Sequence, residues 1–417
     1  MRRFLTVLVL VTLVAAGCGD DSDDSDDGAP APSTTEGAGA TTTTGGNQAS
    51  GDPVVVGVIN MENAPTGSFP EIREGMQAAA DYLNAELGGV TGHPIQLESC
   101  TTNGTPEATT QCANEMVEKG VTVVAAGEDI QMGSAYPILE EAGISVVGLA
   151  PLTPADFSAP NGFYFSGGTV ASMLALVAFV DEYLQAGKVA VMFQDEAAGQ
   201  AALPLVTGPL DKLGIEHVEI GEAPDAADFT PAVTAAQQAD PDVLLLLFAP
   251  QGCAGIMKAH RSLGLDIPMA TTGACYTDEV IESAGEGAEG TYFTLGPSLE
   301  DPEDDEDVAL YREKVEQYAS GVDYRGLTGL GFSTIMTLYY VLDGIGFDAL
   351  SPASVMDALK TTQGGRLFMG EPAGWTCGQL AIMPSLCNTA VRIYQYQEGG
   401  LVDATDGAFV DGRELLG

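Results

Sequence analysis

The sequence predicts an α/β protein with two lobes, each built on a mostly parallel, doubly wound sheet flanked by helices. Three features of the 417-residue chain carry this prediction. From Val54 onward, short apolar segments alternate with segments of helical spacing, and the loops between them are short. The apolar segments are continuous, as expected for strands that are covered on both faces. The alternation starts afresh near residue 169, so two α/β units of similar size follow one another.

The first unit begins with the strand VVVGVI at residues 54–59. Ile72, Met76 and Leu83 then fall on one face of a helix, which Gly88-Gly89 ends. On the same reasoning we expect strands at 54–59, 95–97, 121–126 and 144–150, and helices at 71–87, 106–119 and 134–142. This regular alternation of strand and helix favours a parallel sheet.

The second unit opens with an apolar helix at 169–186. Asp181 and Glu182 interrupt it, so burial explains it better than a membrane span. We expect strands at 188–193, 217–220, 243–249 and 267–272, and helices at 200–213, 229–239 and 253–263. An acidic loop at 298–308 leads to helices at 308–319, 327–342 and 352–360. The tail, 390–402, alternates like a hairpin with a Gly-Gly turn.

The N-terminus has the layout of a cleaved secretory signal. Arg2 and Arg3 precede an apolar run that is shorter than the about 20 residues needed to cross a membrane. Small residues before Cys18 resemble a lipobox, so we expect residues 1–17 to be cleaved and Cys18 to carry a lipid. The alternative is a secreted protein with a stray cysteine near its cleavage site. Residues 18–51 have no large apolar side chain and are predicted to form a disordered tether.

Acidic residues dominate the composition. The chain has 59 Asp and Glu against 15 Lys and Arg, a formal net charge of −44. Phosphate binding needs clustered basic residues, so no nucleic acid partner is expected. A solvated acidic surface is the simplest interpretation, and it would also suit a saline habitat.

The sequence contains none of the common catalytic or metal-binding motifs. GxSxG, GxxxxGK[ST], HExxH and CxxC are all missing, and His93, His217 and His260 lie far apart. The acidic run at 301–307 lacks the spaced ligands and central glycine of an EF-hand loop. We therefore expect no metal, no cofactor and no catalysis. An active site assembled from distant segments is the alternative.

The cysteines favour three disulfides. With Cys18 set aside, six remain, and they form close pairs in the sequence: Cys100 with Cys112, Cys253 with Cys275, and Cys377 with Cys387. Disulfides persist in the oxidising compartments that exported proteins reach. We expect neighbours to pair, although the sequence alone leaves other pairings open.

Residues 54–100 resemble the opening of the type I periplasmic binding proteins. Gly75, Asn84-Ala85, Gly88-Gly89 and Gly92 fall at family spacing, and residues 242–273 and 285–293 fit as well. Within that fold the chain most resembles the branched-chain amino acid receptors of ABC importers, over about 54–405. The resemblance implies three crossings between lobes, near 168, 296 and 366. The predicted first lobe is 52–168 with 297–365, and the second is 169–296 with 366–417.

The resemblance also implies a ligand cleft between the lobes, lined by loops at the carboxyl ends of the strands. The matching first-lobe residues are Ser68, Phe69, Ile130, Gln131, Ser134, Ala150, Leu152 and Thr153. The matching second-lobe residues are Ala198, Pro250, Gln251, Thr272 and Tyr276. Ser134 is expected to open a helix whose amides could receive a carboxylate, with a plain helix cap as the alternative. A bridge between Cys253 and Cys275 would pin two of these loops.

Two departures from the amino acid receptors argue against an α-amino acid as ligand. Ala198 stands where the resemblance implies a tyrosine, and Thr272 stands where it implies the acid that pairs with the ligand's ammonium. A buried ammonium without a partner costs several kcal/mol. Glu128, Asp129 or Asp195 could substitute for the missing acid. Otherwise the ligand is expected to be an amide, a carboxylate or a neutral apolar molecule.

The resemblance therefore implies a solute-binding receptor rather than an enzyme. We expect a monomer that closes two lobes on a small molecule and delivers it to the membrane subunits of an ABC permease. It would be exported and lipid-anchored to the outer face of the cytoplasmic membrane, or periplasmic. One rival is a sensor subunit that delivers the same closure to a signalling partner, which a neighbouring transporter operon would argue against. The other is an exported hydrolase, which turnover in a substrate screen would reveal.

Overall fold

The protein contains two sheets, each with helices on both faces. The computed structural model describes residues 48–65, 67–148, 150–223, 226–300 and 305–416. The predicted signal peptide, Cys18 and most of the predicted tether lie outside these residues. The first sheet has the order β2-β1-β3-β4-β5 and is parallel throughout. Its strands are β1 (Val54–Met61), β2 (Ile95–Thr102), β3 (Val123–Ala126), β4 (Val146–Gly148) and β5 (Gly162–Tyr164). We call this sheet and the helices packed on it the first lobe.

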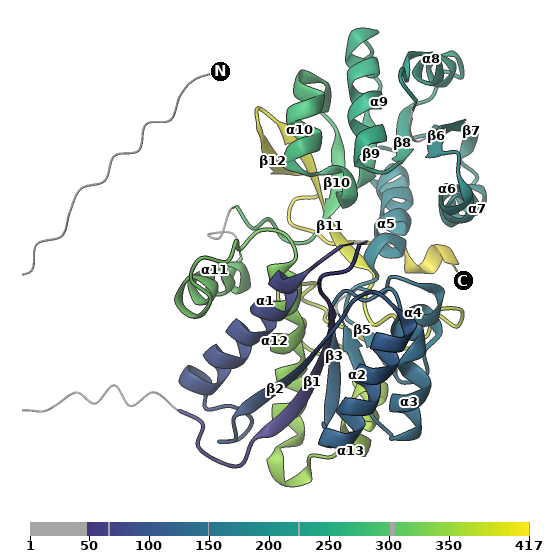
Figure 1. The fold of residues 1–417 in the computed structure, drawn as a ribbon. Helices are drawn as coiled ribbons and strands as arrows, with labels where there is room; N and C mark the ends of the chain where they lie inside the picture. The colour runs from purple at the N-terminus through teal and green to yellow at the C-terminus, as the bar shows by residue number, and fades with distance from the viewer. Residues whose placement is uncertain (1–47, 66, 149, 224–225, 301–304, 417) are drawn as a thin grey trace, which may run out of the picture. The chain divides into compact units, whose positions relative to one another are not determined.

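Helices cover both faces of the first sheet (Figure 1). Helices α1, α12 and α13 pack on one face, and α2 and α3 pack on the other. The first lobe contains α1 (Pro70–Tyr82), α2 (Pro106–Lys119), α3 (Tyr136–Glu141), α4 (Pro154–Ser158), α11 (Glu306–Tyr318), α12 (Thr328–Ile345) and α13 (Pro352–Thr361). The helix predicted at 71–87 is α1 followed by a π-helical turn, Leu83–Leu87, which ends at the left-handed Gly88.

Two glycines let α1 and α12 pack with their backbones in contact. A Cβ added to Gly75 would lie 2.1 Å from the carbonyl oxygen of Thr328. A Cβ added to Gly331 would lie 1.9 Å from the carbonyl oxygen of Ile72. Real side-chain carbons do not approach backbone oxygens so closely, so this helix pair requires glycine at both positions.

The second sheet has the order β12-β11-β10-β9-β8-β6-β7, with β13 beside β11. Strands β6 to β10 are parallel, whereas β11 and β12 are antiparallel to their neighbours. The strands are β6 (Lys188–Gln194), β7 (Glu216–Glu222), β8 (Val243–Leu247), β9 (Met269–Thr272), β10 (Tyr292–Leu295), β11 (Ala390–Gln397), β12 (Gly400–Asp403) and β13 (Val410–Asp411). We call this sheet and its helices the second lobe.

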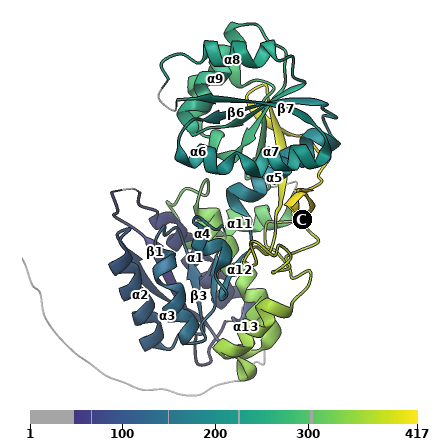
Figure 2. The same ribbon diagram turned by 90° about the vertical axis from the view of Figure 1, so that its right-hand side faces the viewer.

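Two separate cores lie on the two faces of the second sheet. Helices α8 (Thr230–Gln238), α9 (Pro250–Ser262) and α10 (Asp278–Ala284) cover one face, and α5 (Gly168–Glu182) and α7 (Pro204–Leu213) cover the other (Figure 2). The helix predicted at 200–213 is two helices, α6 (Ala197–Ala202) and α7, because Pro204 begins a new one. The hairpin predicted at 390–402 is present, and Glu398 and Gly399 form its turn, both with positive φ.

The third passage of the chain between the sheets comes later than predicted. Residues 366–387 were expected in the second lobe, but they pack against the first sheet. Trp375 is buried in the core of the first lobe, and Leu386 forms a bridge with Tyr164 at the edge of β5. The chain therefore leaves the first lobe at residues 388–389. This segment has neither helical nor strand periodicity, so its side-chain packing was not visible in the pattern.

Three disulfides link the cysteine pairs that the sequence favours. They join Cys100 to Cys112, Cys253 to Cys275, and Cys377 to Cys387. The first ties β2 to α2, and the second ties α9 to the turn after β9. Each bridge closes a short loop, and the prediction of neighbour pairing is confirmed. Among the described residues, none of the helices has the length and apolar character needed to span a membrane.

Candidate functional site

Asn60 organises the carboxyl edge of the first sheet. It is fully buried at the end of β1. Its amide nitrogen donates to the carbonyl oxygen of Phe69 (2.8 Å) and to Glu62 (3.2 Å). Its amide oxygen accepts from the backbone N–H of Glu128 (3.1 Å), just beyond β3. One side chain therefore fixes both the loop before α1 and the loop after β3, which the resemblance assigns to the ligand.

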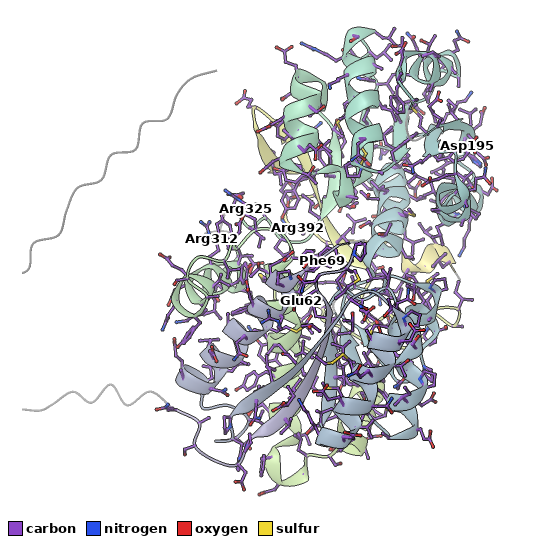
Figure 3. The ribbon with its side chains drawn as sticks, in the orientation of Figure 1. Glu62, Phe69, Asp195, Arg312, Arg325 and Arg392 are labelled. Atoms are coloured by element: carbon purple, nitrogen blue, oxygen red, sulfur yellow. A yellow bond between two sulfur atoms is a disulfide. The ribbon has the colours of Figure 1, made fainter. Side chains whose placement is uncertain are left out.

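The loop before α1 is further held by its own polar groups. The backbone N–H of Asn63 donates to Ser68 Oγ (3.0 Å), and Glu62 pairs with Arg73 (2.8 Å). Ser68 is exposed and Phe69 is half-buried. Figure 3 shows Glu62 and Phe69 close together at this end of the first lobe. The two predicted ligand residues of this loop therefore lie beside the Asn60 network, with Ser68 Oγ already used as an acceptor.

Asp129 does not replace the missing acid of the amino acid receptors. It is fully buried, and Oδ2 accepts from the hydroxyls of Thr102 and Thr109, each at 2.8 Å. Its Oδ1 accepts from the backbone N–H of Gln131, also at 2.8 Å. Both carboxylate oxygens are thus occupied inside the first lobe. Asp129 instead fixes the loop that carries Glu128 and Ile130.

Ser134 does not open a helix, contrary to the expectation. It ends a 3-10 turn, Met132–Ser134, and its backbone N–H already donates to the carbonyl oxygen of Gln131 (2.8 Å). Helix α3 begins only at Tyr136 and is a short helix of six residues. A carboxylate cannot use the Ser134 amide without breaking this turn.

Asp156 holds the loop after β4 in place. The Thr153-Pro154-Ala155-Asp156 spacing, which is that of a capping box, could have indicated this role. It is buried in α4 and caps the helix through Thr153, whose N–H (2.6 Å) and hydroxyl (2.9 Å) both donate to Oδ2. The N–H of Leu152 donates to the same oxygen (3.0 Å), and the Tyr136 hydroxyl donates to Oδ1 (2.6 Å). Thr153, a predicted ligand residue, is thereby engaged as the cap of α4.

Two tyrosines extend this network into the core. The hydroxyls of Tyr136 and Tyr164 are in direct hydrogen-bond contact. Burial raises the pKa of both tyrosines, and the charge of Asp156 raises them further, so both hydroxyls stay protonated. The loop of Ala150, Leu152 and Thr153 is therefore held by Asp156, whose carboxylate is fully hydrogen-bonded.

The carboxyl edge of the first sheet also carries two exposed apolar side chains and one unpaired carboxylate. Ile130 is 39% exposed and Leu152 is 38% exposed, and they are among the few large apolar side chains in the described part of the chain that water reaches so freely. Glu128 makes no side-chain hydrogen bond or ion pair with a described residue. Burial raises the pKa of Glu128, and the charges of Asp156 and Glu71 raise it further. The edge thus offers two apolar side chains and one unpaired carboxylate.

The matching edge of the second lobe is organised by Gln194 at the end of β6. Its side-chain oxygen accepts from the N–H of Ala249, beyond β8 (3.1 Å), and its amide nitrogen contacts Glu196. Ala198 is exposed on α6 and offers no ring or hydroxyl to a ligand. Gly199 beside it is required, because a Cβ there would lie 1.9 Å from the carbonyl oxygen of Gln194.

Asp195 is the other acid considered as a substitute. It is exposed at the surface of the second lobe beside α6, and Gln200 Nε2 donates to its Oδ1 (2.7 Å) (Figure 3). A carboxylate in this open position gains little from pairing with a cation, since water competes for it. Of the three candidate acids, Glu128 is therefore the one whose carboxylate is both unpaired and partly buried.

Thr272 and Tyr276 are placed by the second-lobe core. Thr272 is buried at the end of β9. Tyr276 is half-buried, and its ring centroid lies 5.3 Å from that of Phe293 and 6.5 Å from that of Tyr396. The ring of Tyr276 therefore contacts two other aromatic rings of the second lobe. Cys253 and Cys275 are both fully buried next to this loop and fix its position.

Pro250 and Gln251 line a pocket of about 430 Å³ between α8, α9 and α10. Lys258 and Asp228 also line it, and Lys258 Nζ donates to Ser283 Oγ (2.8 Å). Pro250 and Gln251, two of the predicted ligand residues, thus line a pocket within the second lobe. No group of three or more metal-ligating side chains occurs among the described residues.

The comparisons with known proteins agree with this architecture. A family model described as periplasmic binding protein matches residues 53–400. The chain therefore belongs to the periplasmic binding protein family, whose members are extracytoplasmic receptors for solutes. An "Amino acid binding protein" of Pseudomonas aeruginosa is 25% identical over 316 residues, which cover 74% of this chain and 82% of that protein.

Solved structures show the same fold. A putative branched-chain amino acid ABC transporter protein from Rhodospirillum rubrum has a TM-score of 0.72 at 17% identity, covering 84% of this chain and 99% of that one. The leucine binding protein LivK of Thermotoga maritima has a TM-score of 0.62 at 17% identity, covering 86% and 99%. LivJ of Streptococcus pneumoniae, solved with isoleucine, has a TM-score of 0.62 at 16% identity, also covering 86% and 99%. At these identities the likeness establishes the two-lobed fold.

Proposed function

We propose that this protein is an extracytoplasmic solute-binding receptor of an ABC importer, which closes its two lobes on a small polar or amphipathic molecule. The observation that carries the proposal is the pair of parallel-dominated sheets joined by three passages of chain. These passages follow β5, β10 and residue 387. A few such connections can act as a hinge while each lobe stays rigid. The structural relatives named as a leucine binding protein, a putative branched-chain amino acid ABC transporter and a transporter substrate binding protein support the same role.

The proposed ligand site lies at the carboxyl edges of the two sheets, where open α/β proteins bind their ligands. From the first lobe it uses the loops of Ser68 and Phe69, of Ile130 and Gln131, and of Ala150 and Leu152. From the second lobe it uses the residues that follow β6, β8 and β9. The Asn60, Asp156 and Gln194 networks support this proposal, because they fix these loops before a ligand arrives.

The proposed ligand is not an α-amino acid, although relatives are named for amino acids. An α-amino acid carries both an ammonium and a carboxylate. The second-lobe position that the resemblance assigns to the ammonium's partner is Thr272, and the Ser134 amide that was expected to receive the carboxylate already donates to Gln131. The buried Thr272 hydroxyl supplies no negative charge. Ala198 likewise supplies no aromatic wall. Leucine should therefore bind weakly.

A ligand screen tests this function. Thermal unfolding would be followed with amino acids, amides, carboxylates, amines and aromatic compounds, and hits would then be examined by small-angle X-ray scattering. We expect at least one class to raise the unfolding midpoint and to reduce the radius of gyration, with leucine producing little shift. A large library without a single hit, or hits that leave the scattering unchanged, would argue against a closing receptor. A shift of many degrees with leucine would instead show that Thr272 does not exclude amino acids.

The proposed receptor is monomeric and tethered to the outer face of the cytoplasmic membrane through a lipid on Cys18. The support lies in the sequence, where a short apolar run ends at Cys18 and an acidic stretch follows. Fractionation of cells that express Cys18→Ala tests the anchor. We expect the variant to leave the membrane fraction and to bind ligand as before, whereas unchanged membrane retention would contradict lipidation.

A further inference from the structure

We infer that Glu128 receives a positively charged group of the ligand, so that the receptor takes small aliphatic cations such as primary amines. The inference rests on the proposed function, since Glu128 lies in the proposed ligand site of the first lobe. It assigns a ligand class that neither the family nor the relatives' names supply. Its basis is the contrast between Glu128, which is unpaired, and Asp129, Asp156 and Glu62, whose carboxylates are paired.

The backbone of Glu128 is fixed, although its carboxylate is free. Its N–H donates to Asn60 Oδ1 (3.1 Å), and its carbonyl oxygen accepts from the N–H of Met61 (2.9 Å). Glu128 thus continues the β1–β3 pairing beyond the end of β3. Within the described residues its side-chain oxygens have no hydrogen-bond or ion-pair partner. The backbone at Glu128 is therefore positioned before a ligand binds, and the carboxylate is free to pair with it.

The other acids nearby are already satisfied. Asp129 accepts from Thr102 and Thr109, Asp156 caps α4, and Glu62 pairs with Arg73. The one exception is Glu71 in the first turn of α1, whose side chain has no partner among the described residues either. Burial raises the pKa of Glu128, and Asp156 and Glu71 raise it further. The place next to Glu128 therefore carries negative charge that lacks a compensating cation.

None of the basic residues in the described part of the chain pairs with Glu128. Arg325 binds Glu300 (2.7 Å), and Arg312 stacks on Tyr324. Arg392 is paired with Asp403. Figure 3 shows Arg312 and Arg325 beside α11, separate from Glu62 and Phe69. A ligand carboxylate brought to Glu128 would meet like charge, whereas an ammonium would relieve it.

The neighbouring side chains indicate what the cation should be attached to. Ile130 is two residues from Glu128 and is 39% exposed, and Leu152 on the next loop is 38% exposed. Burial of exposed apolar side chains against an apolar partner contributes favourable free energy of binding. A short branched or linear alkyl chain bearing an amine would satisfy both features at once.

Three compounds that differ in charge but share an alkyl chain provide the test: 3-methylbutylamine, 4-methylpentanamide and 4-methylpentanoate. Their dissociation constants would be measured by calorimetry for the wild type, Glu128→Gln and Glu140→Gln at neutral pH. Glu140 is exposed on α3, so its variant makes the same charge change away from the site. Glutamine keeps the shape of Glu128, whose carboxylate makes no hydrogen bond, so the variant should fold with an unchanged unfolding midpoint.

We expect the amine to bind the wild type best and the carboxylate to bind worst. In Glu128→Gln the Kd of the amine should rise at least about tenfold, the equivalent of about 1.4 kcal/mol, while Glu140→Gln matches the wild type. Equal amine binding in Glu128→Gln, no amine binding at all, or tighter binding of the carboxylate would overturn the inference. A neutral or anionic ligand found elsewhere in the screen that still closes the lobes would remove this inference and leave the receptor function standing. A library with no ligand at all would remove both.

Discussion

Removal of the Asp156 carboxylate should loosen the first-lobe ligand loops and destabilise the lobe as a whole. Four donors point at this buried side chain: the N–H groups of Leu152 and Thr153 and the hydroxyls of Thr153 and Tyr136, at 2.6 to 3.0 Å. Hydrogen bonds to a charged acceptor contribute about 1.5–3 kcal/mol each, and they are not additive. Asp156→Ala leaves all four donors without their acceptor, so we expect a loss of about 4 kcal/mol.

Asp156→Asn is the informative comparison. The amide oxygen can still accept from the three donors that now reach Oδ2. The amide nitrogen can donate to the Tyr136 hydroxyl, which then donates to Tyr164. All the bonds survive in weaker, uncharged form, and we expect a loss of about 1–2 kcal/mol. The matched control is Glu140→Gln, an exposed position on α3, which should change stability by less than about 0.5 kcal/mol.

The single tryptophan makes the measurement specific. Trp375 is buried in the core of the first lobe, and the chain has no other tryptophan. Urea unfolding followed by its fluorescence therefore reports the lobe that contains Asp156. Alanine and asparagine variants of equal stability would refute the reasoning, because the donors would then gain nothing from the remaining oxygen. A loss below about 1 kcal/mol for Asp156→Ala would refute it as well.

Two further predictions concern packing and pH. Gly331→Ala should lower the free energy of unfolding by about 1–3 kcal/mol or more, because its Cβ would lie 1.9 Å from the Ile72 carbonyl oxygen. The control Gly344→Ala lies in the same helix with open space around it and should be neutral or stabilising. Urea unfolding measures both. Burial lowers the pKa of His260, whose Nε2 is buried without a partner, so the unfolded chain takes up a proton before the folded one does. Stability should thus fall as the pH drops through about 6.5, the histidine value in the unfolded chain, and His260→Leu should weaken that dependence. Equal destabilisation by both alanines, or an unchanged pH profile in His260→Leu, would contradict these expectations.

Long helices and apolar buried strands were predictable from the sequence, whereas some short elements were not. The helix expected at 106–119 is α2 with the same bounds, and the strand 54–59 lies within β1. Their signals are strong because a long buried face leaves a regular apolar pattern and a glycine marks the end of α2. By contrast, α4 has five residues and β5 has three, too few to show any periodicity. Segment 366–387 is placed by Trp375 and a disulfide rather than by a repeating pattern.

In the candidate ligand site, too, some residues could be predicted from the sequence and others could not. The resemblance assigned Ile130 and Leu152 to the ligand site, and both are exposed at the carboxyl edge of the first sheet. Their contact with a ligand stays a prediction. It could not identify Asn60, because the fold brings its partners Phe69 and Glu128 near. Asp156 was missed although its capping partner Thr153 is only three residues away. Ser134 was misjudged for a related reason. The sequence shows that a helix begins near Ser134, but whether its amide is free depends on a turn of three residues.

The large negative net charge of the chain also matters locally, at the carboxyl edge of the first sheet. A net charge of −44 can be spread over a solvated surface, and most acids of this protein are exposed. Most of its lysines and arginines are also already paired with carboxylates in the described part of the chain. None of the ion pairs among the described residues includes Glu128, which is partly buried. Long-range attraction would favour the arrival of cations, and because salt screens that attraction, amine association should slow as ionic strength rises. The positive charge missing from this edge is then supplied from outside, by the ligand.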